Sequence, residues 1–202
     1  MEKIKIKEKP KMPTVQKVLY IIWFIIMVYL FIILGTKDYH VPINKLNDKD
    51  SFNKEYNLNI DNIFVYKNGK EALNILNSNG ILFMAYPENI WSDEYATILN
   101  RICKKYGITE IGYYNFKAAR SVSNRDYLNI VNRLKSYNFV TDNGVSNIYS
   151  PTVVFAKNGN IIYYDNETSI IKGNITPEEY WTNSKILNKE AEFEYYLNIY
   201  LG

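Results

Sequence analysis

The pattern of apolar and polar positions divides the chain into three parts. Residues 18–34 form one unbroken apolar run that contains no charged residue, glycine or proline. Residues 37–61 are polar and show little periodicity, which is typical of a linker with room for one short helix around 50–56. From residue 62 onward, short apolar runs alternate with segments whose apolar residues recur every three or four positions. This alternation predicts strands and helices in turn over residues 62–202.

The elements expected in residues 62–202 follow one another in the order β-α-β-α-β-α-β-β-α. Asn68-Gly69 and Asn158-Gly159 are turn signals, and Thr176, Pro177 and Glu179 form a capping box that begins the last helix. The expected strands are 63–67, 81–85, 110–116, 150–156 and 161–165, and the expected helices are 70–76, 92–106, 127–137 and one that starts at 176 and breaks near 183–184. This order predicts an α/β fold with one central mixed sheet and helices on both faces.

The apolar run predicts a transmembrane helix over residues 18–36. Its 17 uncharged residues would span roughly 25 Å as a helix, which is close to the thickness of the hydrocarbon layer. A buried helix of a soluble core would normally have one polar face, and this run has none. A cleaved signal peptide is the alternative. We favour an uncleaved anchor because the run exceeds the usual length of a signal peptide's apolar region and no small-x-small cleavage site follows it.

The charges that flank the run predict its orientation. Residues 1–17 contain six lysines and two glutamates, so they form a basic tail. Positive residues near a membrane span favour the cytoplasmic side. The sequence therefore predicts a single-pass protein of the cell membrane, with a cytoplasmic N-terminus and an extracytoplasmic domain.

Composition excludes several kinds of chemistry. The formal net charge of +3 over 202 residues is too small to indicate a nucleic-acid partner. Cys103 is the only cysteine and His40 the only histidine. A disulfide within the chain, a zinc site of the Cys/His type and a Ser-His-Asp or Cys-His centre are therefore excluded. No spacing of carboxylates supports another metal site, so we expect no metal and no cofactor.

Three stretches resemble one known family. Residues 83–92, Phe-Met-Ala-Tyr-Pro-Glu-Asn-Ile-Trp-Ser, resemble the active-site turn of membrane-anchored thioredoxin-like proteins of Gram-positive bacteria. In that group, which is related to bacteriocin-transport accessory proteins, a Gly-Phe-Pro-Glu-like lead-in precedes Cys-Pro-Trp-Cys. Residues 111–115 with Arg120 resemble the family's third strand, and residues 149–159 resemble its cis-proline strand. The resemblance covers residues 62–179 and implies a thioredoxin fold.

The resemblance also implies that the redox motif is lost. Asn89 and Ser92 stand where the family has its two cysteines, Ile90 replaces the intervening proline, and Trp91 is retained. Disulfide exchange needs an attacking thiolate and a second thiol, so we expect no catalytic residue at this degenerate motif. Ser92 suits a helix cap or a small polar filler, and Asn89 suits a turn or a cap. Pro151 matches the proline whose preceding peptide bond is cis in the family.

Without redox cysteines, the function that the resemblance still implies is the binding of a polypeptide in a groove. The resemblance implies a groove lined by Tyr86, Trp91, Ser150 and Pro151 that holds an extended polypeptide, which requires no cysteine. We therefore expect a non-catalytic module that binds a protein or peptide. The alternatives are a thiol-disulfide oxidoreductase-related accessory protein that acts with a partner's thiols, and a structural subunit of a membrane complex. We expect Cys103 to be a buried structural thiol. We expect Lys189, on the last helix, to be exposed.

Overall fold

The computed structural model describes residues 13–35, 48–138, 144 and 146–202, and the chain divides into two units between His40 and Val41. The first unit contains helix α1 (Thr14–Gly35). Between residues 13 and 30 every side chain is exposed except that of Met27, which is half-buried. Among the helices described, none is both long enough and apolar enough to cross a membrane. Residues 1–12 of the basic tail and residue 36 of the expected span lie outside the described residues.

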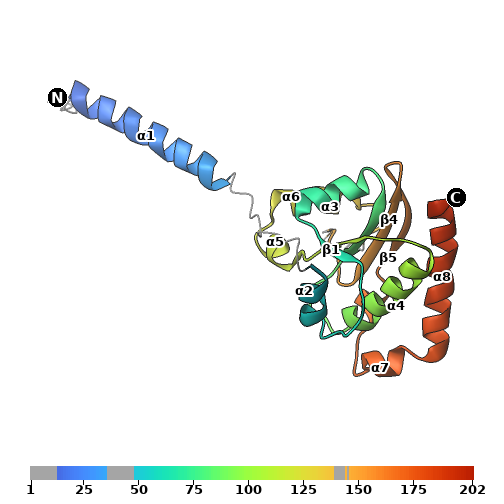
Figure 1. Ribbon diagram of the computed structural model, residues 1–202. Coiled ribbons are helices and arrows are strands. Elements are labelled where there is room, and N and C mark those ends of the chain that lie inside the picture. The colour runs from blue at the N-terminus through green and yellow to red at the C-terminus, as the bar shows by residue number, and fades with distance from the viewer. Residues whose placement is uncertain (1–12, 36–47, 139–143, 145) are drawn as a thin grey trace, which may run out of the picture. The chain divides into compact units, whose positions relative to one another are not determined.

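The second unit is built on a five-stranded mixed sheet, as the alternating pattern predicts (Figure 1). Its strands are β1 (Phe64–Tyr66), β2 (Gly80–Met84), β3 (Ile111–Tyr114), β4 (Thr152–Lys157) and β5 (Asn160–Asp165). The order across the sheet is β1-β3-β2-β4-β5. Strands β1, β3 and β2 run parallel, whereas β4 is antiparallel to both β2 and β5. The two crossovers between parallel strands each contain a helix, as parallel pairing requires.

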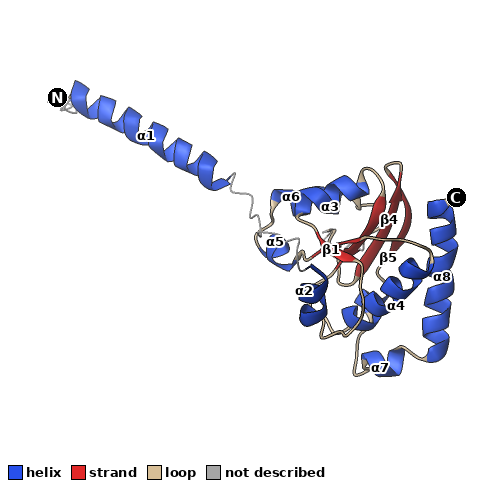
Figure 2. Cartoon of the chain, in the orientation of Figure 1, coloured by secondary structure: helices blue, strands red, loops and turns tan. Residues whose placement is uncertain are grey.

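Helices cover both faces of this sheet (Figure 2). Side chains of α3 (Gly69–Leu76) and α6 (Arg125–Arg133) pack on one face, and those of α2 (Asp48–Glu55), α4 (Ser92–Lys105) and α8 (Asn183–Leu201) pack on the other. Strand β2 supplies both cores, because successive side chains point to opposite faces. Ile81 and Phe83 join the core under α4, while Leu82 and Met84 join the core under α3.

Several elements differ from the expected ones. The polar segment expected to be a linker over 37–61 is part of the folded unit from Asp48 onward, because Phe52 of α2 is fully buried and stacks on Phe64 at 4.0 Å between ring centroids. The rest of that expected linker, up to residue 47, lies outside the described residues. The sequence pattern also missed two short helices, α5 (Lys117–Ser121) and the 3-10 helix η2 (Glu167–Ile170). The helix expected to start at the capping box and break near 183–184 is observed as α7 (Pro177–Tyr180) and α8, which are separated by a break at residues 181–182.

Polar side chains close the outer edge of β1. This strand lies at one edge of the sheet and pairs with β3 alone. The backbone N–H of Phe64 donates to Asn62 Oδ1 at 3.1 Å, and that of Tyr66 donates to Asp48 Oδ2 at 3.2 Å. Both acceptor residues are buried. An unpaired edge strand is a template for unwanted pairing, and here side chains occupy the donors that would otherwise remain free.

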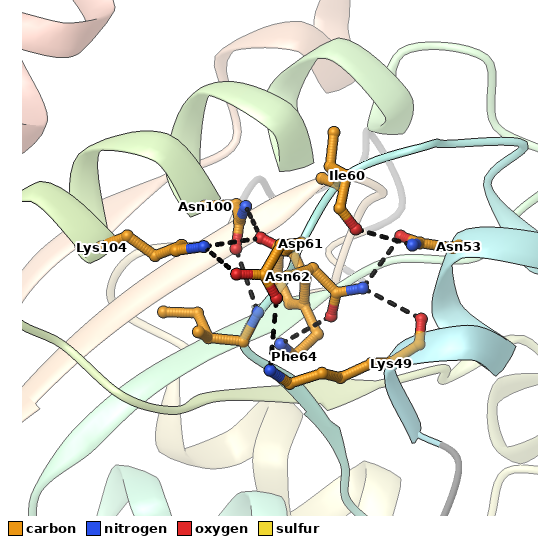
Figure 3. A network of polar contacts seen from close by, with 9 residues as sticks. Lys49, Asn53, Ile60, Asp61, Asn62, Phe64, Asn100 and Lys104 are labelled. Carbon is orange, nitrogen blue, oxygen red and sulfur yellow. Dashed lines mark hydrogen bonds and ion pairs between the residues drawn. The ribbon is translucent and has the colours of Figure 1, made fainter.

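The same region ties α2 and α4 to the start of the sheet (Figure 3). Asn62 Nδ2 donates to the carbonyl of Lys49 at 3.0 Å and to Asn53 Oδ1 at 2.9 Å. Asn100 of α4 accepts from the N–H of Ile63 and donates to the carbonyl of Asp61, each at 3.1 Å. These bonds explain why residues with a linker-like composition fold as part of the sheet unit.

Candidate functional site

The Asn89–Ser92 turn lies beside Ser150 because of the register between β2 and β4. Met84 pairs with Thr152 in that antiparallel ladder. Continuing the register by two residues places Tyr86, just beyond the end of β2, opposite Ser150, just before β4. The backbone N–H of Tyr86 accordingly donates to Ser150 Oγ at 3.2 Å. The peptide bond between Ser150 and Pro151 is cis, as the family resemblance implies for this proline.

Ser150 is the residue on which the turn converges. Asn89 Nδ2 donates to the backbone carbonyl of Ser150 at 2.8 Å, and the hydroxyls of Ser92 and Ser150 share a hydrogen bond of 3.1 Å. Ser92 is fully buried and Ser150 is 3% exposed. Asn89 and Ser92, which the resemblance aligns with the family's cysteines, therefore both bond to the residue that precedes the cis proline.

The side chains of this turn do not cap α4. The N-cap residue is Trp91, and no side chain accepts a hydrogen bond there. Asn89 Oδ1 instead accepts from the N–H of Trp91 at 3.0 Å, which closes a local turn before the helix begins. Of the two roles expected for Ser92, a helix cap or a small polar filler, the structure supports the second, because its hydroxyl points to Ser150. Ser92 fills a buried position, and Asn89 stabilises the turn.

Aromatic and apolar side chains surround this polar centre. Trp91 is half-buried and meets the ring of Tyr180 edge to face, at 5.6 Å between centroids and an interplanar angle of 87°. Ile90 is 60% exposed. On the β3 side, the half-buried ring of Tyr86 packs edge to face on Phe116 at 5.5 Å. We use the name Trp91 surface for Ile90, Trp91 and Tyr180.

The residues expected to line a groove are only partly accessible. Tyr86 and Trp91 are half-buried, whereas Ser150 and Pro151 are buried. A partner would therefore contact the aromatic rings and Ile90 rather than Ser150 or Pro151. A cavity of about 310 Å³ lies at the other end of β2, where Gly80 and Tyr200 contribute to its lining. It contains none of the residues of the turn.

The described part of the chain offers no activated nucleophile at this turn. The hydrogen-bond partner of Ser92 is another hydroxyl, which is too weak a base to activate it. Cys103 is fully buried in α4, and burial raises the pKa of its thiol well above the ordinary value. It is the structural thiol that its place in the sequence predicts. Asp93, the next residue after Ser92, has a carboxyl whose pKa burial raises to about 6.

Sequence reasoning missed one group of acidic residues close to the Trp91 surface. Oxygens of Asp165, Glu167 and Glu192 lie within 4.8 Å of one another, a spacing that could hold a metal ion. The ammonium group of Lys189 lies among them, at 2.8 Å from Asp165 and 2.6 Å from each glutamate. Lys189 is 4% exposed, so the expectation that it is an exposed position is wrong. No spacing of acidic residues in the sequence predicts this cluster, because Asp165, Glu167 and Glu192 come from separate elements.

Comparison with known proteins identified no relative. No protein-family model, no curated protein and no solved structure matches the chain.

Proposed function

We propose that residues 48–202 form a thioredoxin-like domain that has lost its redox cysteines and binds a protein or peptide segment at the Trp91 surface. The observation that carries the proposal is the convergence of Asn89 and Ser92 on Ser150. By the resemblance, these two side chains stand where the family has its thiols. They form hydrogen bonds to Ser150 and cannot exchange disulfides. The strand order and the cis bond before Pro151 also agree with the resemblance.

Binding, rather than catalysis, follows from which groups are accessible. The polar atoms of Asn89, Ser92 and Ser150 are engaged with one another or with backbone, so they offer little to a substrate. Ile90 is exposed and Trp91 half-exposed beside them. Tryptophan and tyrosine are frequent among the residues that dominate binding energy in protein interfaces. The same surface fits an apolar segment of a polypeptide.

The proposal includes attachment to the cell membrane through residues 18–36, with the domain outside the cytoplasm. It is supported by the sequence, in which residues 18–34 carry no charge and six lysines precede them. Fractionation of cells that express the full chain tests it. Recovery with membranes after an alkaline carbonate wash, together with digestion of the domain by protease added to intact protoplasts, is the expected result. Release into the soluble fraction would refute the anchor.

Photo-crosslinking in living cells tests the binding function. A photoreactive benzoylphenylalanine replaces Ile90 in the full chain, and a second variant carries it at Asn188, an exposed residue of α8, as the matched control. We expect a discrete adduct from position 90 that Trp91→Ala removes. Equal adducts from positions 90 and 188, or none from either, would refute the Trp91 surface as a binding site.

An insulin-reduction assay separates binding from redox catalysis. The wild-type chain has a single thiol, Cys103, which is fully buried, and a resolving thiol is missing. We therefore expect no reduction of insulin above the dithiothreitol background. Turnover above that background would refute a non-catalytic role.

A further inference from the structure

Lys189 is a buried cation held by carboxylates from three elements. Its ammonium group lies 2.8 Å from Asp165 at the end of β5, 2.6 Å from Glu167 in η2 and 2.6 Å from Glu192 in α8. The lysine is 4% exposed and Asp165 side-chain exposure is 11%. We use the name Lys189 cage for this lysine and its three carboxylates. Lys189 and Asp165 are the buried pair, whereas Glu167 and Glu192 are partly exposed. A buried ion pair holds its elements in a fixed arrangement, since removing one partner leaves the other uncompensated.

Lys189 remains charged inside its cage. Burial by itself would lower the pKa of the ammonium group, but the nearby carboxylates, Asp165 foremost, raise it above the ordinary lysine value. Burial likewise works to raise the pKa of Glu167, and hydrogen bonds from Lys189 and Tyr180 outweigh it, so that this pKa is lowered. Lys189 and Glu167 therefore form an ion pair, and the ammonium group occupies the space between the three carboxylates that a metal ion would need.

Glu167 connects the cage to the Trp91 surface. Its second carboxylate oxygen accepts a hydrogen bond of 2.5 Å from the hydroxyl of Tyr180. The ring of Tyr180 then meets Trp91 edge to face. A continuous series of contacts thus leads from Lys189 through Glu167 and Tyr180 to Trp91.

The cage also reaches the helix that follows the turn. Asp165 accepts a hydrogen bond from the hydroxyl of Tyr95, which is fully buried in α4. Tyr95 lies one helical turn after Trp91 and Ser92, where α4 begins. The cage therefore contacts the Trp91 surface from two directions, through Tyr180 of α7 and through α4.

We propose that Lys189 and Tyr180 are positioning residues of the Trp91 surface, which they hold in its binding arrangement. The proposal rests on the proposed function, because it assigns these residues a role at the same site. Neither the ammonium group of Lys189 nor the hydroxyl of Tyr180 needs to contact the partner, because both bond to Glu167. Ordering the Trp91 side chain before a partner arrives removes part of the entropy that binding would otherwise cost.

The first measurement does not depend on a partner. The full chain is labelled with 5-fluorotryptophan, and Trp→Phe variants assign the three fluorine resonances. Tyr180→Phe keeps the ring and removes only the hydroxyl that bonds to Glu167, and Lys189→Met removes the charge. We expect both to shift or broaden the Trp91 resonance in the folded protein. The matched controls, Tyr195→Phe in α8 and Lys70→Met in α3, alter exposed residues and should leave the resonance in place.

The second measurement repeats the crosslinking from position 90 in the same variants. We expect roughly two- to tenfold less adduct from Tyr180→Phe, because immobilising a side chain during binding weakens affinity on that scale. Tyr180→Phe also keeps the test valid if Lys189→Met fails to fold. An unchanged Trp91 resonance and unchanged adduct in folded Tyr180→Phe would overturn the positioning role and leave the proposed function standing. Absence of adduct from the wild-type chain would overturn both.

Discussion

Placing two cysteines at the turn tests its geometry directly. In the double variant Asn89→Cys/Ser92→Cys, both side chains point toward Ser150, as the native ones do. The N–H of Ser92 donates to the carbonyl of Asn89 at 3.0 Å, which closes a four-residue turn whose end Cα atoms lie within about 7 Å. Disulfides require Cα atoms roughly 4.4–6.8 Å apart. We therefore expect the double variant to form an intramolecular disulfide.

The energetic cost of the double variant follows from the bonds it removes. The native side chains make three hydrogen bonds at the turn: from Asn89 to the Ser150 carbonyl, from the Trp91 N–H to Asn89, and between Ser92 and Ser150. At about 1 kcal/mol each, the reduced variant should be about 3 kcal/mol less stable than the wild type. Closing a four-residue loop with a disulfide should recover about 2 kcal/mol. The oxidised variant should thus be about 1 kcal/mol less stable than the wild type.

Oxidation with glutathione disulfide followed by mass spectrometry is the assay. We expect a loss of two hydrogens, located within one peptide that contains both positions 89 and 92, while Cys103 remains a buried thiol. Urea unfolding of the oxidised and reduced forms then measures the recovered stability. Each single-cysteine variant is a control that should form no internal disulfide. A double variant that stays reduced, or that pairs with Cys103, would show that the two side chains do not converge and would refute the geometry behind the proposed function.

Three further predictions concern stability, and urea unfolding measures each. Lys189→Met should lower the free energy of unfolding by about 3 kcal/mol, because it leaves the buried carboxylate of Asp165 without its cation, whereas Glu167 keeps Lys185 at 3.5 Å; a loss below about 1 kcal/mol would contradict the cage as a stabilising element. Asp93→Asn should stabilise the protein above pH 6 and have no effect below the ordinary aspartate pKa of 3.8, because burial raises the pKa of Asp93 to about 6 and the folded state must carry an uncompensated charge once that group ionises; an equal effect at both ends of this range would contradict it. Asn62→Ala should cost about 2–3 kcal/mol, because the fully buried N–H of Phe64 loses its acceptor, whereas Asn59→Ala, at an exposed loop position, should cost far less.

Local patterns were sufficient to predict most of the sheet. Strand β2 and strand β4 are short apolar runs bounded by turn residues, and the mixed sheet with helices on both faces follows from their alternation with helical periods. The convergence on Ser150 was also foreseeable in outline, since the resemblance places residues 89–92 beside Pro151. The role of the Ser92 hydroxyl was not, because capping is a local property and its actual partner is 58 residues away.

The elements that the sequence did not reveal depend on contacts between distant segments. A short helix was expected around 50–56, but not its place in the folded unit: α2 has a mostly charged and polar sequence, and it packs on the sheet because Phe52 enters the core and Asn62 bonds to its backbone. Lys189 looks like an ordinary surface lysine in an amphipathic helix. Its burial depends on Asp165 and Glu167, which the β5 strand and the η2 turn deliver to the same place. No periodicity within one segment carries that information.

The hydrogen bonds made by Asn89 and Ser92 limit what the turn can recognise. Asn89 occupies the backbone carbonyl of Ser150 with a 2.8 Å hydrogen bond, so this carbonyl is not open to a partner. The hydroxyls of Ser92 and Ser150 satisfy one another, and burying unpaired polar groups against a partner would be costly. Under the proposed function, recognition would then come from Ile90 and Trp91, whose apolar surface remains accessible. Variants of Ile90 and Trp91 should therefore change partner capture much more than Ser92→Ala, which acts on a buried hydroxyl and should act mainly on stability.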